Sequence, residues 1–287
     1  MTTIRKILFP VDFSPACDAM APFVKRAAAI FSAAVTLVYV LEPSASAFEV
    51  LVRPAPQAED DCKKVACAKL ESYLSGEFPL HDIPRLVAMG EAAARIAEVA
   101  RNRGFDMIVM PTHAGVFRRA LLGSTTAKVL NDADCMVMTT QHAETLAPRP
   151  LEHREWVCAI GLSADSERVL RRATELAESV HANLGLIHAI PSAAPDLPGQ
   201  LGLEGRVHAQ ESLAAHERIS ALQRRVGSQA PVKVAFGPIK NALTEAAGRL
   251  GADALLIGRN SQSGSQGRLR DLTYAVVRDA PCPVISI

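Results

Sequence analysis

Apolar segments of strand length alternate with segments of helical periodicity along the whole chain. In the first half, the apolar segments predicted as strands are residues 4–11, 35–41, 85–89, 107–110 and 135–140. Helices are predicted between them, at residues 15–31, 58–75 and 91–102 and from Gly123 onward. This regular alternation predicts an open parallel sheet covered by helices on both faces.

The second half of the chain repeats the pattern of the first. Its predicted strands are residues 156–160, 184–190, 232–236, 254–257 and 282–287. AMG at residues 88–90 recurs as AFG at residues 235–237, and ADCMV at 133–137 recurs with the same offset as APCPV at 280–284. The sequence therefore predicts two tandem α/β domains, residues 1–141 and 155–287, joined by a charged, proline-containing linker at residues 142–154.

One stretch of the first copy combines a strand, a polar loop and a helix start. The loop begins at Pro111, and Gly123, Ser124 and Thr125 open the next helix. A helix N-terminus presents unpaired N–H groups and a partial positive charge, and small residues let an anion approach. The cationic side chains that could balance a phosphate nearby are His113, Arg118, Arg119 and Lys128. Taken alone, the segment fits either a phosphate site or an ordinary helix cap.

The ends of other strands in the first copy supply further candidate contacts for a nucleotide. Ligands of open parallel sheets bind beyond the carboxyl ends of the strands, where the strand order reverses. Asp12 follows the first strand, and its carboxylate could accept a hydrogen bond from a ribose hydroxyl. The backbone at residues 38–40 could offer a donor and an acceptor to an adenine edge. These features together favour a nucleotide site in the first domain.

The second copy lacks these features. In the repeat register, Gly161 stands where the first copy has Asp12, and Arg270-Asp271 stand where it has Gly123-Ser124. We expect the carboxylate of Asp271 to cap a helix start and to repel a phosphate. The second domain is therefore predicted to be structural.

Composition and charge narrow the class of protein. The 287 residues are 49% hydrophobic and 21% charged, with a formal net charge of +1. This balance gives no reason to expect nucleic-acid or membrane binding, and no run of 18 apolar residues predicts a membrane span. The six cysteines form no Cys-x-x-Cys pair, and no signal peptide is recognised. We therefore expect a cytoplasmic protein with reduced thiols.

With Asp12, the strand–loop–Gly-Ser–helix segment and the repeat taken together, the chain resembles the universal stress protein family in its tandem form. The family pattern is an Asp after the first strand, and then Gly-x-x-Gly, nine residues and Gly-Ser/Thr after the fourth. This sequence has Pro111 and Ala114 in place of the two glycines, and its loop is one residue short. Gly115 could take over part of their role, because glycine tolerates any backbone angle.

The resemblance implies a Rossmann-like, adenine nucleotide α-hydrolase-like fold that binds ATP, with or without Mg²⁺. The nucleotide-binding residues that it implies are Pro10, Asp12, Val40, Pro111, Thr112, His113, Gly115, Gly123, Ser124 and Thr125. No residue is assigned a catalytic or metal-binding role. In the family the last strands pair across an interface, which implies pairing of the two domains and association of two chains.

Three functions are weighed. The leading hypothesis is a stress-response or signalling protein that binds ATP with little or no catalysis; weak ATPase activity would need a base such as His113. An ATP pyrophosphatase would need a Ser-Gly-Gly-x-Asp-Ser loop after a first strand, and neither copy has one. An interaction module with empty pockets is favoured by the lost glycines and disfavoured by Asp12 and Gly123-Ser124.

Overall fold

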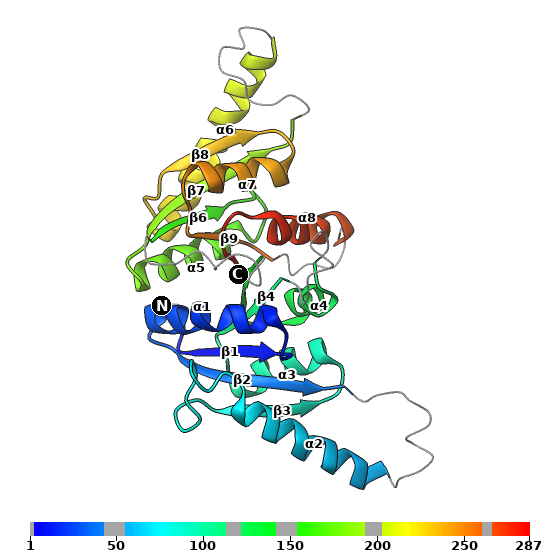
Figure 1. The fold of residues 1–287 in the computed structure, drawn as a ribbon. Helices are drawn as coiled ribbons and strands as arrows, with labels where there is room; N and C mark the ends of the chain where they lie inside the picture. Colours follow the sequence, from blue (N-terminus) through cyan, green and yellow to red (C-terminus); the bar gives the residue numbers. More distant parts are fainter. Residues whose placement is uncertain (1–2, 43–54, 113–121, 142–153, 193–202, 260–265) are drawn as a thin grey trace. The chain divides into compact units, whose positions relative to one another are not determined.

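The computed structural model describes residues 3–42, 55–112, 122–141, 154–192, 203–259 and 266–287 (Figure 1). The chain divides into two compact units, one built mostly from Ile4–Met138 and the other mostly from Arg149–Ile287. Among the described residues there are eight helices and ten strands. Each unit is a parallel sheet with helices on both sides, so the predicted fold class is confirmed. The predicted linker lies outside the described residues except for Arg154.

The first unit contains β1 (Lys6–Val11), α1 (Pro15–Phe31), β2 (Ala34–Leu41), α2 (Ala55–Ser72), β3 (Arg85–Met89), α3 (Ala92–Arg103), β4 (Met107–Pro111), α4 (Ser124–Asp132) and β5 (Met136–Thr140). Its strand order is β3-β2-β1-β4-β5, with β1 parallel to β2 and to β4, and β2 parallel to β3. Figure 1 shows β1, β2 and β3 side by side, with α2 running along β3.

The second unit contains β6 (Glu155–Ala159), α5 (Ser166–Ser179), β7 (Asn183–Ile190), α6 (Leu203–Val226), β8 (Val232–Phe236), α7 (Ile239–Arg249), β9 (Ala254–Ile257), α8 (Gln266–Asp279) and β10 (Val284–Ser286). The order β8-β7-β6-β9-β10 is the same as in the first unit. The predicted internal repeat is therefore confirmed. Among the described residues, no helix has both the length and the apolar composition needed to cross a bilayer.

The strand order determines where a ligand can reach the first sheet. The chain moves outward from β1 to β3 and then returns to β4 on the other side of β1. Right-handed crossovers therefore put α1 and α2 on one face and α3 and α4 on the other. The contacts agree, because Tyr73 after α2 donates to Asp18 of α1, and α3 packs against α4. The reversal lies between β1 and β4, where open α/β sheets bind ligands.

One aspartate in each domain holds the start of the first strand. Asp106 Oδ2 accepts hydrogen bonds from the backbone N–H groups of Arg5 (2.8 Å) and Lys6 (2.9 Å). In the second domain, Asp253 Oδ2 accepts from the N–H of Glu155 (2.9 Å). The two carboxylates satisfy backbone donors at a strand start. This shared contact shows that the repeat extends to individual hydrogen bonds.

The helix starts test two sequence predictions. The Ser14 side chain caps α1 by accepting from the N–H of Cys17 (3.4 Å), and Pro15 is the first helical residue, as predicted. The prediction that Asp271 caps a helix start is wrong. Helix α8 begins at Gln266, which puts Asp271 inside the helix, whereas a cap must precede the first turn. The prediction rested only on the register of the repeat, because the sequence around Asp271 has no clear signal for a helix start, and it placed the start of the helix too late.

Candidate functional site

The predicted site residues that the structure describes lie at one edge of the first sheet. The β1–β4 register pairs Ile7 with Met107 and Leu8 with Ile108, so the two strands end side by side at Val11 and Pro111. Asp12 and Thr112 follow directly after these ends. The N–H of Gly123 donates to the carbonyl of Thr112 (2.8 Å), which ties the start of α4 to the end of β4. The fold therefore gathers Asp12, Thr112 and Gly123 around the reversal point.

The Asp12 carboxylate is exposed but held at one oxygen. Its Oδ1 accepts from the N–H of Ser14 (3.0 Å) and from the thiol of Cys17 (3.1 Å between Sγ and Oδ1). Among the described residues, Oδ2 has no hydrogen-bond partner. One oxygen is therefore occupied by the protein and the other can accept a hydrogen bond from a ligand.

The Cys17 thiol stays protonated at physiological pH. Its side chain is 2% exposed. Burial, and after it the negative charge of Asp12, raise the pKa of Cys17 to about 12. The thiol is therefore a permanent donor to Asp12 rather than a reactive thiolate.

The residue after Asp12 makes a tight turn between β1 and α1. Phe13 has a φ of 61°, in the left-handed region. A side chain in this region costs about 1–2 kcal/mol. The Phe13 ring packs against Tyr39 (4.6 Å between centroids) and Tyr73 (4.9 Å), and the Lys69 ammonium lies 3.9 Å from its centroid. Each aromatic pair contributes about 0.5–1.5 kcal/mol, so the cluster offsets the conformational cost of the turn at Phe13.

The start of α4 is not an ordinary serine cap. Gly123 occupies the cap position, without a side-chain cap, and Ser124 is the first helical residue. Ser124 is exposed and Thr125 is half-buried. Thr126 is buried, and its Oγ1 donates to the carbonyl of Pro111 (3.0 Å). Small residues at Gly123 and Ser124 thus leave the first turn accessible, while Thr126 fastens the helix to β4.

Other predicted residues have supporting positions. Thr112 is 1% exposed, so its side chain is not at the surface of the edge. Pro10 is buried within β1. Val40 is half-buried and lies one residue past the last β1–β2 pair, Val11 with Tyr39. His113 and Gly115, together with Ala114, Arg118 and Arg119, lie outside the described residues.

The Lys128 ammonium group is already paired with a carboxylate. Its Nζ donates to Glu91 Oε1 (2.8 Å), and Glu91 also caps α3 by accepting from the N–H of Ala94 (2.8 Å). The hydrogen bond from Lys128 is the main reason that the pKa of Glu91 is lowered. Both side chains are about half exposed, so the pair adds little stability. A phosphate would have to compete with Glu91 for this ammonium group.

The same edge of the second domain is organised differently at the end of β6. Gly161 replaces the aspartate, and the buried Ser166 occupies the repeat position of Cys17. Ser166 Oγ donates to the carbonyl of Gly161 (3.1 Å) and accepts from the N–H of Ser163 (2.8 Å). Gly161 itself has no carboxylate to receive a ribose hydroxyl.

Protein atoms also occupy the end of β9. Arg168 Nη2 donates to the carbonyl of Arg259 (3.2 Å), which corresponds in the repeat to Thr112. A Cβ on Gly258 would lie 2.6 Å from the Val169 side chain, so α5 packs tightly on this strand end. These contacts, rather than the predicted cap at Asp271, distinguish the second edge from the first.

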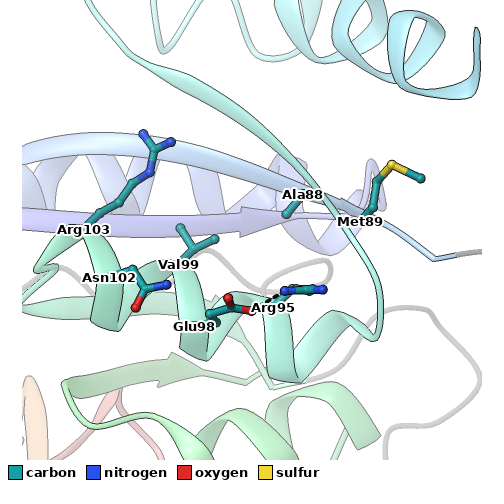
Figure 2. A pocket seen from close by; sticks show the side chains of 7 residues that line it. All are labelled: Ala88, Met89, Arg95, Glu98, Val99, Asn102 and Arg103. Carbon is teal, nitrogen blue, oxygen red and sulfur yellow. Dashed lines mark hydrogen bonds and ion pairs between the residues drawn. The ribbon is translucent and has the colours of Figure 1, made fainter. Parts of the chain in front are cut away.

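A cavity of about 290 Å³ lies between β3 and α3, away from these residues (Figure 2). Arg95 and Glu98 form an ion pair beside it, and Met89, Val99 and Arg103 line other parts of its wall. None of the predicted nucleotide-binding residues lines this cavity. We assign it no ligand.

Sequence reasoning missed two residues of the edge, Cys17 and Thr126. Cys17 is the third helical residue after the cap Ser14, the position from which a side chain reaches back in a capping box. That spacing was a usable signal. Thr126 gave no comparable signal, because its partner Pro111 is 15 residues earlier in the chain.

A search against protein-family models matches the universal stress protein family at residues 3–141 and again at 154–287. The chain belongs to this family. Universal stress protein A homolog 1 of Coxiella burnetii (strain RSA 493 / Nine Mile phase I) is 23% identical over 140 residues, which cover 48% of this chain and 97% of that protein. Homolog 2 from the same organism is 28% identical over 140 residues, covering 47% of this chain and 94% of that protein.

A solved structure extends the likeness to both domains. A universal stress protein from Archaeoglobus fulgidus DSM 4304 matches with a TM-score of 0.66 and 16% identity, covering 99% of this chain and 96% of that one. At this identity the match shows the fold alone. It confirms the Rossmann-like architecture that the sequence of this universal stress protein predicted.

Proposed function

We propose that this universal stress protein binds ATP in its first domain and acts as a stress-response or signalling protein with little or no ATP hydrolysis. The observation that carries the proposal is the state of the Asp12 carboxylate. It lies at the reversal point of the sheet, with Oδ1 held by two donors and Oδ2 without a partner among the described residues. A carboxylate fixed in this way is suited to accept a ribose hydroxyl.

The start of α4 supports binding of the phosphates. Gly123 and Ser124 are small, and the first turn of the helix presents backbone N–H groups and a positive dipole end. Hydrogen bonds from Gly123 to Thr112 and from Thr126 to Pro111 hold this turn beside the end of β4. The phosphate position is therefore preorganised relative to Asp12, which lies at the end of the neighbouring strand.

The end of β2 supports binding of the base. The last pair between β1 and β2 is Val11 with Tyr39. Strand β2 extends beyond the end of β1 at Val40, which pairs with Ala88 of β3. Backbone groups that extend beyond a neighbouring strand can meet the edge of a base. We assign the adenine to this position.

We take the ligand as the magnesium complex of ATP, because Mg²⁺ is commonly held by substrate phosphates and few protein groups. Among the described residues, no three or more His, Cys, Asp or Glu side chains are grouped to hold a metal ion. We propose that the second domain binds no nucleotide, because Gly161 has no carboxylate and the Arg259 carbonyl already accepts a hydrogen bond from Arg168.

The test is to measure MgATP binding by calorimetry and to identify any nucleotide released from the freshly denatured protein. We expect about one site per chain. Asp12→Ala should weaken binding tenfold or more, because a hydrogen bond to a charged group contributes about 1.5–3 kcal/mol. Ser124→Asp should weaken it further by placing a negative charge at the phosphate position.

Matched controls separate the site from general effects of charge. Asp82→Ala and Ser75→Asp make the same two changes at exposed positions between α2 and β3, at the opposite edge of the sheet. Both controls should bind MgATP as the unmodified chain does. If the unmodified chain binds no ATP at millimolar concentration, the proposal fails and the interaction-module hypothesis takes its place. Release of phosphate at a rate of catalytic turnover would contradict the part that excludes hydrolysis.

A further inference from the structure

The contact between Cys17 and Asp12 joins the first turn of α1 to the end of β1. The Cys17 thiol donates to Asp12 Oδ1, and the N–H of Ser14 donates to the same oxygen. The Ser14 hydroxyl in turn accepts from the N–H of Cys17. In a capping box, the side chain at the third helical position would accept from the N–H of the cap residue. Here the carboxylate of Asp12 takes that N–H, and Cys17 holds the carboxylate.

The second domain shows the same network without the carboxylate. At the repeat position of Cys17, Ser166 accepts directly from the N–H of Ser163 and donates to the carbonyl of Gly161. Both domains thus place a buried donor at this position and direct it to Asp12 or to its repeat counterpart, Gly161. The donors differ in the group that they approach most closely. Cys17 Sγ lies 3.1 Å from Asp12 Oδ1 and 3.9 Å from the Pro10 carbonyl oxygen, whereas Ser166 Oγ lies 3.1 Å from the Gly161 carbonyl oxygen.

We propose that Cys17 is a positioning residue that orients the Asp12 carboxylate and so allows the first domain to distinguish ribonucleotides from deoxyribonucleotides. This inference rests on the proposed function. With both donors on Oδ1, rotation of the carboxylate is restricted and Oδ2 is the oxygen presented to the ligand. Without the thiol, the carboxylate must be ordered when the ribose binds, which lowers the affinity that the hydroxyl contributes.

Two properties of Cys17 make it suited to this role. The Cys17 side chain is buried, so the thiol has little access to water as an alternative acceptor. The raised pKa of about 12 keeps the thiol protonated, so it donates at every physiological pH. The sulfur also fits a position where the other domain accepts a hydroxyl, which makes Cys17→Ser a conservative variant.

The experiment measures affinities for ATP, 2′-deoxy-ATP and 3′-deoxy-ATP in the full chain and in Cys17→Ala, Cys17→Ser and Ser166→Ala. In the unmodified chain, the analogue lacking the contacted hydroxyl should bind about tenfold more weakly than ATP. Cys17→Ala should weaken ATP binding about three- to tenfold while leaving that analogue nearly unaffected, because only the hydroxyl contact depends on the carboxylate. Cys17→Ser should restore the discrimination, and Ser166→Ala, the matched change in the second domain, should leave it unchanged.

A double-mutant cycle sharpens the test, since a residue that acts through Asp12 can have no effect once Asp12 is gone. Adding Cys17→Ala to Asp12→Ala should therefore change ATP affinity by less than about twofold. The inference is overturned if Cys17→Ala keeps full discrimination, or if it weakens ATP and both deoxy analogues equally. Absence of ATP binding in the unmodified chain would instead refute the proposed function itself, so the two failures are distinguishable.

Discussion

Replacing Thr126 by valine removes one hydroxyl from the junction between α4 and β4 and keeps the shape of the side chain. Thr126 is 3% exposed, and its Oγ1 donates to the carbonyl of Pro111 at 3.0 Å. Since Pro111 is buried at the end of β4, the substitution leaves its carbonyl without this donor. A buried polar group left unsatisfied costs about 1–3 kcal/mol, and we expect Thr126→Val to destabilise the first domain by this amount.

The repeat supplies a matched control. Thr273 occupies the corresponding position in α8. In the described part of the second domain, the Thr273 hydroxyl has no hydrogen-bond partner. Thr273→Val should therefore change the stability of its domain by less than about 0.5 kcal/mol.

The two domains can be followed separately during unfolding in urea. Trp156 is the single tryptophan of the chain and is buried in the second domain, so its fluorescence reports on that domain. Hydrogen exchange read by mass spectrometry on peptides from β4 and α4 reports on the first domain. Because urea m-values are about 1–3 kcal/mol/M, Thr126→Val should lower the midpoint in those peptides by roughly 0.5–2 M.

The same variant links stability to binding. If Thr126 holds the start of α4 at the phosphate position, Thr126→Val should also weaken MgATP binding, whereas Thr126→Ser should keep it because a hydroxyl remains. Equal midpoints for Thr126→Val and the unmodified chain, or equal losses in Thr126→Val and Thr273→Val, would refute the reasoning from the Pro111 carbonyl.

Two further predictions concern stability. Arg85 donates hydrogen bonds to four backbone carbonyls between residues 70 and 83. Arg85→Met should therefore lower the free energy of unfolding of the first domain by roughly 2–4 kcal/mol, measured in urea. Arg103→Met is the control and should change it little, because the Arg103 side chain has no hydrogen bond among the described residues. Hydrogen bonds from Arg278 and then Lys240 lower the pKa of Asp279. Its stabilisation is therefore complete above the unfolded pKa of about 3.9 and is lost as the pH falls through the lower folded pKa. Asp279→Asn should flatten the acid side of the pH–stability curve, and an unchanged slope below about pH 4 would contradict this assignment.

The elements of the fold were predictable from the sequence because their signals are local. The spacing of apolar residues within a segment indicates whether it forms a strand or a helix. All the predicted strands of the first copy lie within two residues of their predicted bounds. The repeat then determined that two such domains follow each other. The rule that ligands bind where strand order reverses pointed to the edge that carries Asp12 and Gly123. The association of two chains stays a prediction.

What only the tertiary structure decided is which side chains meet across that edge. The sequence analysis gave Cys17 no role, and only the fold places its thiol against the Asp12 carboxylate, beside the turn at Phe13. Asp271 looked like a cap because its position came from the repeat register, and a longer α8 placed it inside the helix. The second edge is filled by Arg168 reaching Arg259, 91 residues later in the chain. Such contacts depend on the packing of elements against each other, and the pattern within any single element does not encode them.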